Sequence, residues 1–291
     1  MSFSRRASNM RSVLCVVLVL TLASCGFGSS NGSGTGSDDV PTKREVVCQF
    51  HDERLTEISG LAASTQHPGI LWTHNDSGDS ARVFAIDSQT CAVRAEVRLA
   101  GVSARDVEAI AVGKSSNGTP VIWVGDIGDN ADSWPSVHLY RFNEPKTIKS
   151  QSVTTTSYTV HYPDGPHNAE GLLVAPNPGG PMWIVTKSGT GNGGIYKLPA
   201  DFVSSGSGTA RRVGDTLTAA TDASYAPDGR NYAIRGYFQA SMYPAPPPNG
   251  SGTSIDLPLQ PQGEAMTFSA NSRFLYMAGE KSNDLWTVPL P

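Results

Sequence analysis

The sequence has few charged residues, and its charge is weakly negative. Charged side chains make up 16% of the 291 residues, and the formal net charge is −4. Nucleic-acid binding needs a basic surface, so this composition argues against a nucleic acid as the partner. Residues 57–291 also contain no G-x-S-x-G, H-E-x-x-H or C-x-x-C pattern. The common motifs of serine hydrolases, zinc proteases and thiol redox proteins are therefore missing from this region.

Long apolar runs are missing as well. The apolar run Ser12–Leu22 holds about eleven residues, whereas a membrane-spanning helix needs roughly 20. Arg5, Arg6 and Arg11 lie before or at its start, and Leu22-Ala23-Ser24-Cys25 ends it. This order resembles a bacterial lipoprotein signal peptide. We expect residues 1–24 to be removed and Cys25 to become the lipidated first residue. The alternative is an ordinary secretory signal beside an incidental cysteine.

A lipidated Cys25 would place the protein on the cell membrane, facing away from the cytoplasm. Several acyl chains, palmitate among them, give the stable anchoring that one chain does not. Residues 25–43 are rich in Gly and Ser and have almost no apolar side chains, which predicts a flexible tether. A tether of this length would hold the domain roughly 25 Å from the lipid. We expect an anchored monomer.

Cysteine is scarce, and its four copies have separate expected roles. Cys15 leaves with the signal peptide and Cys25 takes the lipid. Cys48 and Cys91 remain in a domain that is exported to an oxidising compartment. A Cys48–Cys91 disulfide is therefore expected, with two buried thiols as the alternative.

The sequence does contain a unit of short apolar runs separated by turns, and this unit occurs five times. The runs are rich in Val, Ile, Tyr and Trp, and the chain holds 30 glycines and 20 prolines, which suits strands and turns. Each unit begins near an acidic residue: Glu57, Glu108, Glu170, Asp222 and Glu264. Aromatic residues mark the second run (Trp72, Trp123, Trp183, Tyr232 and Tyr276) and the third run (Phe84, Tyr140, Tyr196, Tyr243 and Trp286).

The length of this unit predicts the fold. Successive acids lie 42 to 62 residues apart, and four strands in roughly 40–50 residues are typical of a β-propeller blade. We therefore expect an all-β, five-bladed propeller over residues 44–291, with six blades as the alternative. The fifth unit has only three runs, so Glu45–Phe50 is expected to supply its outer strand and close the ring. The other outer strands are expected at 91–100, 157–163, 210–215 and 254–259.

The innermost strand of a propeller blade lines the central channel, so the five acids are expected at one mouth of that channel. The end of each second run is expected beside them. The candidate ligand-binding or catalytic residues are Glu57, His74, Asp76, Glu108, Asp126, Glu170, Lys187, Asp222, Arg235, Glu264 and Lys281. Crowded carboxylates must protonate, pair with a base or bind a cation.

Two interpretations of this mouth remain open. In the first, Lys187, Arg235 and Lys281 pair with the acids of the last three units and hold the blades together. In the second, the mouth is a ligand site, because units one and two are acidic there, Asp106 included. Glu57, Glu108 and Asp126 are the predicted Ca²⁺ ligands. The repeated D-x-G-D-[SN] loops at Asp76 and Asp126 are oxygen-rich too, although such sequences also form ordinary turns.

The blade sequences also carry a resemblance. The segments LWTHNDSGDSARVFAID, DVEAIAVG, IWVGDIGDN and EAMTFSANSRFLYMAGE are similar to those of exported bacterial β-propeller proteins. More loosely, they resemble the esterase-like propeller domain named after phytase. Propeller phytases bind Ca²⁺ and phosphate through acidic channel residues, so the resemblance implies similar chemistry here. The leading hypothesis is a lipid-anchored propeller that binds a small ligand or an envelope protein at its channel mouth. The alternatives are a Ca²⁺-dependent phosphoesterase or esterase, and an envelope scaffold.

Overall fold

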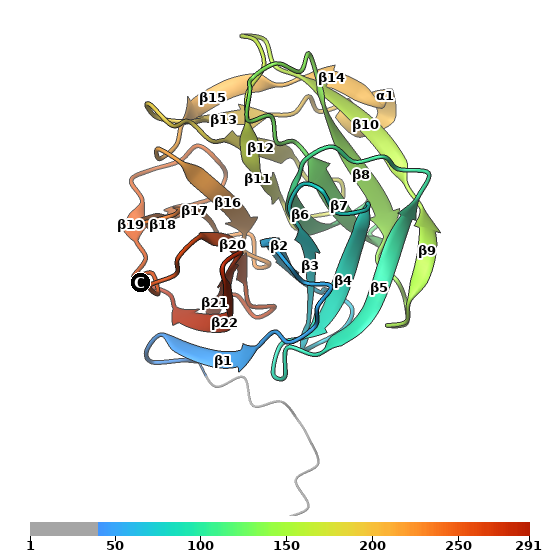
Figure 1. Cartoon of the computed structure of the whole chain (residues 1–291). Coiled ribbons are helices and arrows are strands. Elements are labelled where there is room, and N and C mark those ends of the chain that lie inside the picture. Colours follow the sequence, from blue (N-terminus) through green and yellow to red (C-terminus); the bar gives the residue numbers. More distant parts are fainter. Residues whose placement is uncertain (1–39) are drawn as a thin grey trace, which may run out of the picture. The chain divides into compact units, whose positions relative to one another are not determined.

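The computed structural model describes residues 40–291, and these residues form five β-sheets arranged around a central axis (Figure 1). The innermost strands contact one another in the cyclic order β2, β6, β11, β16, β20 and back to β2. The prediction of a five-bladed propeller is therefore confirmed, and six blades are excluded. The expected signal peptide, Cys25 and most of the expected tether lie outside the described residues. Among the residues described, no helix is both long and apolar enough to span a membrane.

Each blade has four antiparallel strands, which follow one another in order from the axis to the outside. Blade 1 holds β2 (Ile58–Ala63), β3 (Ile70–Asn75), β4 (Arg82–Asp87) and β5 (Val93–Ala100). Blade 2 holds β6 (Val107–Lys114), β7 (Pro120–Asp126), β8 (Val137–Asn143) and β10 (Thr156–His161). Blade 3 holds β11 (Ala169–Val174), β12 (Met182–Thr186), β13 (Gly194–Lys197) and β15 (Arg211–Asp215).

Blades 4 and 5 follow the same plan. Blade 4 holds β16 (Ala220–Tyr225), β17 (Asn231–Gly236), β18 (Ala240–Pro244) and β19 (Thr253–Ser254). Blade 5 holds β20 (Gly263–Phe268), β21 (Phe274–Gly279), β22 (Ser282–Pro289) and β1 (Glu45–Gln49). The outer strand of blade 4 is much shorter than the expected 254–259, because Pro258 and the loop around it leave the sheet.

Three short elements were not expected from the sequence. β9 (Gln151–Thr154) pairs in parallel with β5, and β14 (Ser207–Thr209) pairs in parallel with β10. β9 adds a fifth strand to blade 1 and comes from the connection between β8 and β10 of blade 2. β14 adds a fifth strand to blade 2 and comes from the connection between β13 and β15 of blade 3. The helix α1 (Phe202–Ser205) lies on the path from β13 to β14. These crossing strands cover edges that would otherwise be open.

The ring is closed by the N-terminal strand, as expected. β1 pairs antiparallel with β22, the last strand of the chain. The disulfide between Cys48 and Cys91 is present, with the two sulfurs 2.09 Å apart. It joins the closing strand of blade 5 to the residues just before β5 of blade 1. The two ends of the propeller are thus held by a sheet and by a covalent bond.

The core is divided among the five interfaces between blades. Each apolar cluster combines residues of two neighbouring blades, as in the cluster of blades 1 and 2 that includes Trp72 and Phe142. The predicted second-run aromatics Trp72, Trp123, Trp183 and Tyr232 are at most 3% exposed. Burial of such large side chains is the main stabilising contribution available to a sheet protein.

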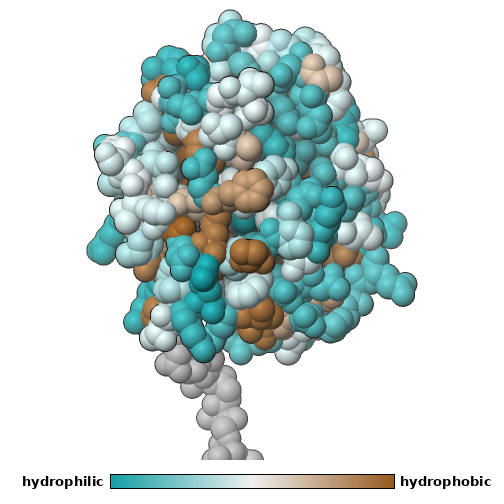
Figure 2. Space-filling model, turned by 60° about the vertical axis from the view of Figure 1, so that its left-hand side comes forward, coloured by the Kyte–Doolittle hydropathy of each residue, from teal (hydrophilic) through white to brown (hydrophobic). Residues whose placement is uncertain are grey.

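The surface is polar over much of its area, but some apolar residues are exposed. Figure 2 shows apolar atoms gathered on the side that lies at the left of Figure 1, where blades 4 and 5 are. Phe238 follows β17 and is 93% exposed, and Leu259 precedes β20 and is 95% exposed. A contiguous exposed apolar patch, unlike a single exposed side chain, is common at sites of ligand or partner contact.

Candidate functional site at one mouth of the channel

A β-bulge near the start of every innermost strand creates the first ring of side chains. In each blade one residue of this strand has no partner in the neighbouring strand, and such bulges re-aim a side chain. We call these five positions the bulge ring. Its members are Ser59, Glu108, Glu170, Thr221 and Glu264.

The expected ring of five acids is therefore wrong at two positions. Glu57 lies two residues before the bulge of blade 1 and is exposed. Asp222 lies one residue after the bulge of blade 4 and is buried. The carboxylate of Asp222 accepts hydrogen bonds from the backbone N–H groups of Ala223 (2.7 Å) and Met266 (2.6 Å). Asp222 thus joins blade 4 to blade 5 instead of facing the mouth with the other acids.

The residue that follows the second strand of each blade forms a second ring, which we call the strand-end ring. Equivalent backbone hydrogen bonds run from Asp76 N to Glu57 O, from Lys187 N to Asn168 O and from Glu280 N to Gln262 O. The members of this ring are Asp76, Ile127, Lys187, Tyr237 and Glu280. Only Asp76 and Lys187 were among the candidate residues.

Three candidates therefore occupy other places. Asp126 is the last residue of β7 and is fully buried, where its Oδ1 accepts the backbone N–H groups of Arg105 and Asp106. Arg235 is fully buried and donates to the carbonyl oxygens of Ala265 and Ala278 in blade 5. Lys281 is exposed and forms no ion pair with any described residue. The predicted pairs Asp222–Arg235 and Glu264–Lys281 are accordingly absent from the described part of the chain.

His74 was a candidate residue of the channel mouth, but it is buried within β3. Its Nδ1–H donates to the carbonyl of Asn75 at 2.9 Å, while its Nε2 has no hydrogen-bond partner. Burial lowers the pKa of His74. A neutral imidazole packed beside Gly60 of β2 is a core residue, so nothing places it at the mouth as a base.

One half of the mouth is held together by a chain of hydrogen bonds. Lys187 Nζ lies 2.9 Å from Glu170 Oε1, so one of the three predicted acid–base pairs is present. The same ammonium donates to Tyr237 Oη at 2.9 Å, and Tyr237 in turn donates to Glu264 Oε1 at 2.9 Å. Gln262 donates to both Glu264 and Glu280. The acids of this half therefore have protein partners.

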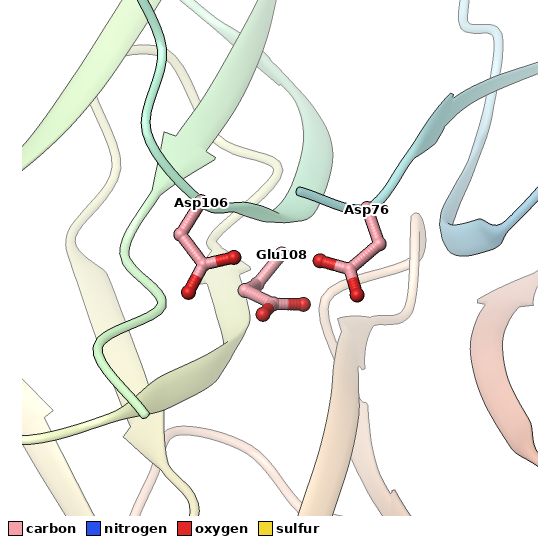
Figure 3. A group of neighbouring side chains, drawn as sticks. All are labelled: Asp76, Asp106 and Glu108. Atoms are coloured by element: carbon pink, nitrogen blue, oxygen red, sulfur yellow. The ribbon is translucent and has the colours of Figure 1, made fainter. Parts of the chain in front are cut away.

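The other half gathers three carboxylates with no base among them. Asp76, Asp106 and Glu108 each present an oxygen within 4.8 Å of the others, and their side chains point toward one another (Figure 3). We call these residues the carboxylate triad. Only Glu108 belongs to the predicted set of Glu57, Glu108 and Asp126. Asp106 was expected in the acidic half of the mouth but not as a ligand, although its two-residue spacing to Glu108 brings both acids to the start of one inner strand.

The crowding and burial of these carboxylates raise the pKa of two of them. Burial, followed by the charges of Asp76 and Asp126, raises the pKa of Asp106 to about 6. Burial, followed by the charge of Glu170, raises the pKa of Glu108. Asp106 is 6% exposed, yet its Oδ1 has no hydrogen-bond partner. A buried carboxylate oxygen without a donor is costly, and a cation would satisfy it.

Gly128 leaves the space in which the triad sits. A Cβ at this position would lie 2.4 Å from Asp106 Oδ2 and 2.8 Å from Glu108 Cγ. The carboxylates of the triad can therefore lie this close together only because residue 128 has no side chain. Carboxylate oxygens bind Ca²⁺ at 2.3–2.6 Å, so two ligands of one ion lie up to about 5 Å apart. The spacing and the donor type of the triad fit a hard divalent cation.

The D-x-G-D loops, in contrast, use their second aspartates internally. Asp79 accepts hydrogen bonds from Asn75 and Arg82. Asp129 Oδ2 accepts the backbone N–H groups of Ser133 (2.8 Å) and Trp134 (2.7 Å). The bonds of Asp129 are those of an ordinary turn, whereas Asp79 is held by an ion pair with Arg82. At the opposite end of the channel, a cavity of about 220 Å³ is lined mainly by apolar side chains, including Leu61, Ile110 and Phe268.

Comparison with known proteins gives no closer assignment. No protein-family model matches the sequence, and no curated protein matches it. Solved structures do resemble the fold. A gluconolactonase from Xanthomonas campestris is 14% identical with a TM-score of 0.47, the match covering 80% of this chain and 72% of the other. The hydrazine synthase of Kuenenia stuttgartiensis is 11% identical with a TM-score of 0.41, covering 84% and 77%. A chain of the mitotic checkpoint complex is 12% identical with a TM-score of 0.42, covering 79% and 63%. At these values the likenesses say nothing of function.

Proposed function

We propose that the protein binds a ligand at the mouth of its channel through a divalent cation, with Ca²⁺ as the ion that fits best. The observation that carries this proposal is the carboxylate triad with the buried, unpartnered Oδ1 of Asp106. Asp76, Asp106 and Glu108 would hold the ion. Three side chains supply only part of the six to eight oxygens that Ca²⁺ takes. The remaining positions are open to water and to oxygen atoms of a ligand.

The surroundings of the triad suggest what such a ligand carries. Oxygen donors such as hydroxyl, carboxylate or phosphate groups would complete the coordination of the ion. Phe238 directly follows Tyr237, whose hydroxyl belongs to the hydrogen-bond chain of the mouth, and Phe238 is almost fully exposed. An apolar part of the ligand or of a protein partner would contact this ring. The sequence-based hypothesis of lipidation at Cys25 would place this mouth outside the cytoplasm.

Glu280 favours a second candidate function, the hydrolysis of an ester bound to the cation. Burial, the hydrogen bonds to Glu264 and Asp76, and the charges of both carboxylates raise the pKa of Glu280 to about 9. A carboxyl group that is neutral at pH 7 carries a proton, which it can donate as a general acid beside a metal site. It would protonate the leaving oxygen, while the cation supplies Lewis-acid activation.

Thermal unfolding of the purified chain in millimolar Ca²⁺ and in chelator tests the binding of the cation. An ion that binds only the folded state at a hundredfold excess over its Kd stabilises it by about 2.7 kcal/mol. For a domain above 200 residues this raises the melting temperature by roughly 5–10 °C. Asp106→Asn should abolish the rise. Glu57→Gln is the matched control, because Glu57 precedes Ser59 as Asp106 precedes Glu108 but is exposed and lies outside the triad.

The same samples separate binding from hydrolysis. Identical melting curves in Ca²⁺ and in chelator would rule out the cation site and with it both candidate functions. If the rise is present, a panel of phosphate and carboxylic esters is assayed with and without chelator. Turnover that needs Ca²⁺ and is lost in Glu280→Gln, while the melting rise persists, would establish the hydrolase. A rise without turnover would leave ligand binding as the function.

A further inference from the structure

Exposed apolar side chains are concentrated on blades 4 and 5. In the described part of the chain, the large apolar side chains that are exposed are Val46, Val203, Phe238 and Leu259. Three of them belong to this side of the propeller: Val46 lies on β1, Phe238 follows β17, and Leu259 lies between β19 and β20. Val203 of α1 is the exception, because α1 lies between strands of blades 3 and 2. This clustering marks one side of the domain as a contact surface.

Partly exposed apolar side chains join these residues into a contiguous patch. Trp286 of β22 lies opposite Val46, so the two side chains are on the same face of blade 5. Trp286, Met242 and Leu257 are only partly buried, and all three pack against the apolar cluster that blades 4 and 5 share. Figure 2 shows apolar atoms gathered on this side of the molecule. We call this surface the apolar edge, and its members are Val46, Phe238, Met242, Leu257, Leu259 and Trp286.

The two most exposed members of the apolar edge protrude from loops. Tyr237 and Phe238 are the central residues of a tight turn in which Gly236 N donates to Gln239 O at 2.7 Å. Turns of this kind favour Gly, Asn or Asp, so the turn itself does not require an aromatic ring at its tip. Phe238 is 93% exposed there, and Leu259 is 95% exposed in the loop that leads to β20. A fluid lipid layer accepts such protruding side chains, whereas a protein partner must offer a hollow of matching shape.

The chain enters the propeller beside the apolar edge. Arg44, the residue before β1, donates to Asp256 Oδ1 at 3.0 Å and to the carbonyl oxygen of Leu257. The sequence predicts that Cys25 carries the lipid, and Cys25 lies 15 positions before Val40, where the described chain begins. A flexible tether of this length spans roughly 20 Å, so a lipid at Cys25 would keep the apolar edge close to the membrane surface.

From these observations we propose that the apolar edge docks on the surface of the lipid bilayer, with Phe238 and Leu259 inserted between the head groups and the acyl chains. The occupant is lipid because the predicted anchor joins the domain at this edge and because the two side chains protrude. The anchor raises the effective concentration of the edge at the membrane, so two inserted side chains suffice for docking. The proposal deepens the proposed function by naming lipid as the apolar contact of Phe238. It rests on the predicted lipidation of Cys25 and requires no cation at the channel mouth.

A chain coupled to lipid at Cys25 allows a direct test. The protein used begins at Cys25 and runs to the end of the sequence, so it contains every strand of the propeller. Cys48 and Cys91 form the disulfide, so Cys25 is the thiol that couples to a maleimide phospholipid in phosphatidylcholine vesicles. The coupling reproduces an anchor at the predicted position and does not depend on lipidation in the cell.

Tryptophan substitutions in the coupled chain report insertion. In Phe238→Trp and Leu259→Trp, the emission added to that of the unaltered chain is expected to shift to shorter wavelength. Phosphatidylcholine with brominated acyl chains is expected to quench this added emission. Val203→Trp is the matched control, because Val203 is exposed but lies outside the apolar edge, and its emission should not be quenched.

The same chain without coupling measures the contribution of the two side chains. At high lipid concentration, Phe238→Ser and Leu259→Ser should each weaken binding to the vesicles about tenfold, the effect of withdrawing one large apolar side chain from lipid. Val203→Ser should bind as the unaltered chain does. Phe238 and Leu259 are almost fully exposed, so neither substitution removes a core contact, and the melting temperature should not change.

All of these measurements are made in chelator, so a failure of the cation site at the mouth would leave their outcome unchanged. Quenching of Phe238→Trp and Leu259→Trp that is no stronger than that of Val203→Trp would overturn the proposal. Vesicle binding that is unchanged in both serine variants would overturn it as well. A shift to shorter wavelength that needs no lipid and grows with protein concentration would identify a second copy of the chain as the occupant, and would also overturn it.

Discussion

Ser59 and Glu108 hold the same position in neighbouring blades, and the hydroxyl of Ser59 donates a hydrogen bond of 3.1 Å to Glu108 Oε2. Blade 1 has a serine and blade 4 has Thr221 at this position, so the bulge ring contains three carboxylates instead of five. Of the three acids that remain, Glu170 pairs with Lys187, and Glu264 accepts from Tyr237. Among the described residues, Glu108 is the ring acid that accepts from neither a lysine nor a tyrosine, and the triad forms around it.

Gly128→Ala tests whether the triad depends on the space that this glycine leaves. The added Cβ would meet Asp106 Oδ2 at 2.4 Å, so the carboxylate must move. We expect the Ca²⁺-dependent rise in melting temperature to disappear, while the fold persists. Gly189→Ala is the control, because a Cβ there meets no atom within 4 Å. A full Ca²⁺ response in Gly128→Ala would show that Asp106 is not a ligand.

The stability of the metal-free protein should fall as the pH rises from 7 to 9. A carboxyl group whose pKa is higher in the folded state binds more protons there than in the unfolded chain, so folding stability decreases between the two pKa values. The pKa of Glu280 is raised to about 9 and that of Glu108 is raised as well, whereas unfolded glutamate titrates near 4.3. His74, with its lowered pKa, is neutral in both states across this window.

Melting curves in chelator across this pH range check the expectation. Glu280→Gln should flatten the decline, because the side chain no longer loses a proton. Glu57→Gln should leave it unchanged, since Glu57 is exposed. A melting temperature that is constant or rises between pH 7 and pH 9 would contradict the assignment of neutral carboxyl groups at the mouth.

The sequence was sufficient for the fold and insufficient for the site, and blade 4 shows why. Strand length, turn residues and aromatic spacing repeat in every blade, so they predict five blades and their closure. The side chains that face the mouth depend on which single residue is bulged. In blade 4 that residue is Thr221, whereas the nearest acid in the sequence is Asp222. A shift of one position turns a side chain to the other face of a strand, and composition does not reveal it.

In blade 1, too, the sequence did not show which residue belongs to the bulge ring. Glu57 was aligned with Glu108, although its structural equivalent is Asp106, and Ser59 is the equivalent of Glu108. For the same reason, some residues predicted to face the mouth at the ends of the second strands lie one or two positions away from the residues of the strand-end ring. Asp126 ends β7, where Asn75 ends β3, and both side-chain oxygens accept two backbone N–H groups from the residues just before the inner strand of the same blade. A polar residue at a strand end was structural, and its neighbour faced the mouth.

Lipidation at Cys25 remains a prediction from the sequence. Cys25→Ala should abolish labelling of the protein by radioactive or alkyne-tagged palmitate and release it from the membrane fraction. The propeller should be unaffected, since Cys25 lies outside residues 40–291. Labelling and detergent-phase partitioning are measured together. Membrane association that persists in Cys25→Ala without labelling would show that another feature anchors the protein.

The Cys48–Cys91 disulfide should contribute measurably to stability. It closes a loop with a sequence separation of 43 residues, and a loop of this size gives about 2–4 kcal/mol. The Cys48→Ser, Cys91→Ser double variant should therefore melt several degrees lower than the unaltered chain. Reductant should lower the melting temperature of the unaltered chain and leave the variant unchanged. A reductant effect of equal size in both would mean that the bond is not what reductant acts on.

Closure by β1 should stabilise the whole ring and not blade 5 alone. β1 supplies the outer strand of blade 5, and Phe50, which follows it, is 3% exposed in the cluster shared by blades 5 and 1. Without this strand β22 becomes an open edge, and the interface of blades 5 and 1 loses part of its core. Each blade is held by its two neighbours, so opening one interface leaves the next blades with a single neighbour.

Deletion of residues 44–50 is the direct test. We expect a lower midpoint in urea and earlier hydrogen exchange in β2 and β20 on either side of the opened interface, spreading to the inner strands of blades 2 to 4. Because the deletion also removes Cys48, the Cys48→Ser, Cys91→Ser double variant is the reference against which it is measured. Loss of protection confined to β22, with the midpoint of the reference retained, would show that β1 only covers an edge. A midpoint well below that of the reference would show that closing the ring stabilises all five blades together.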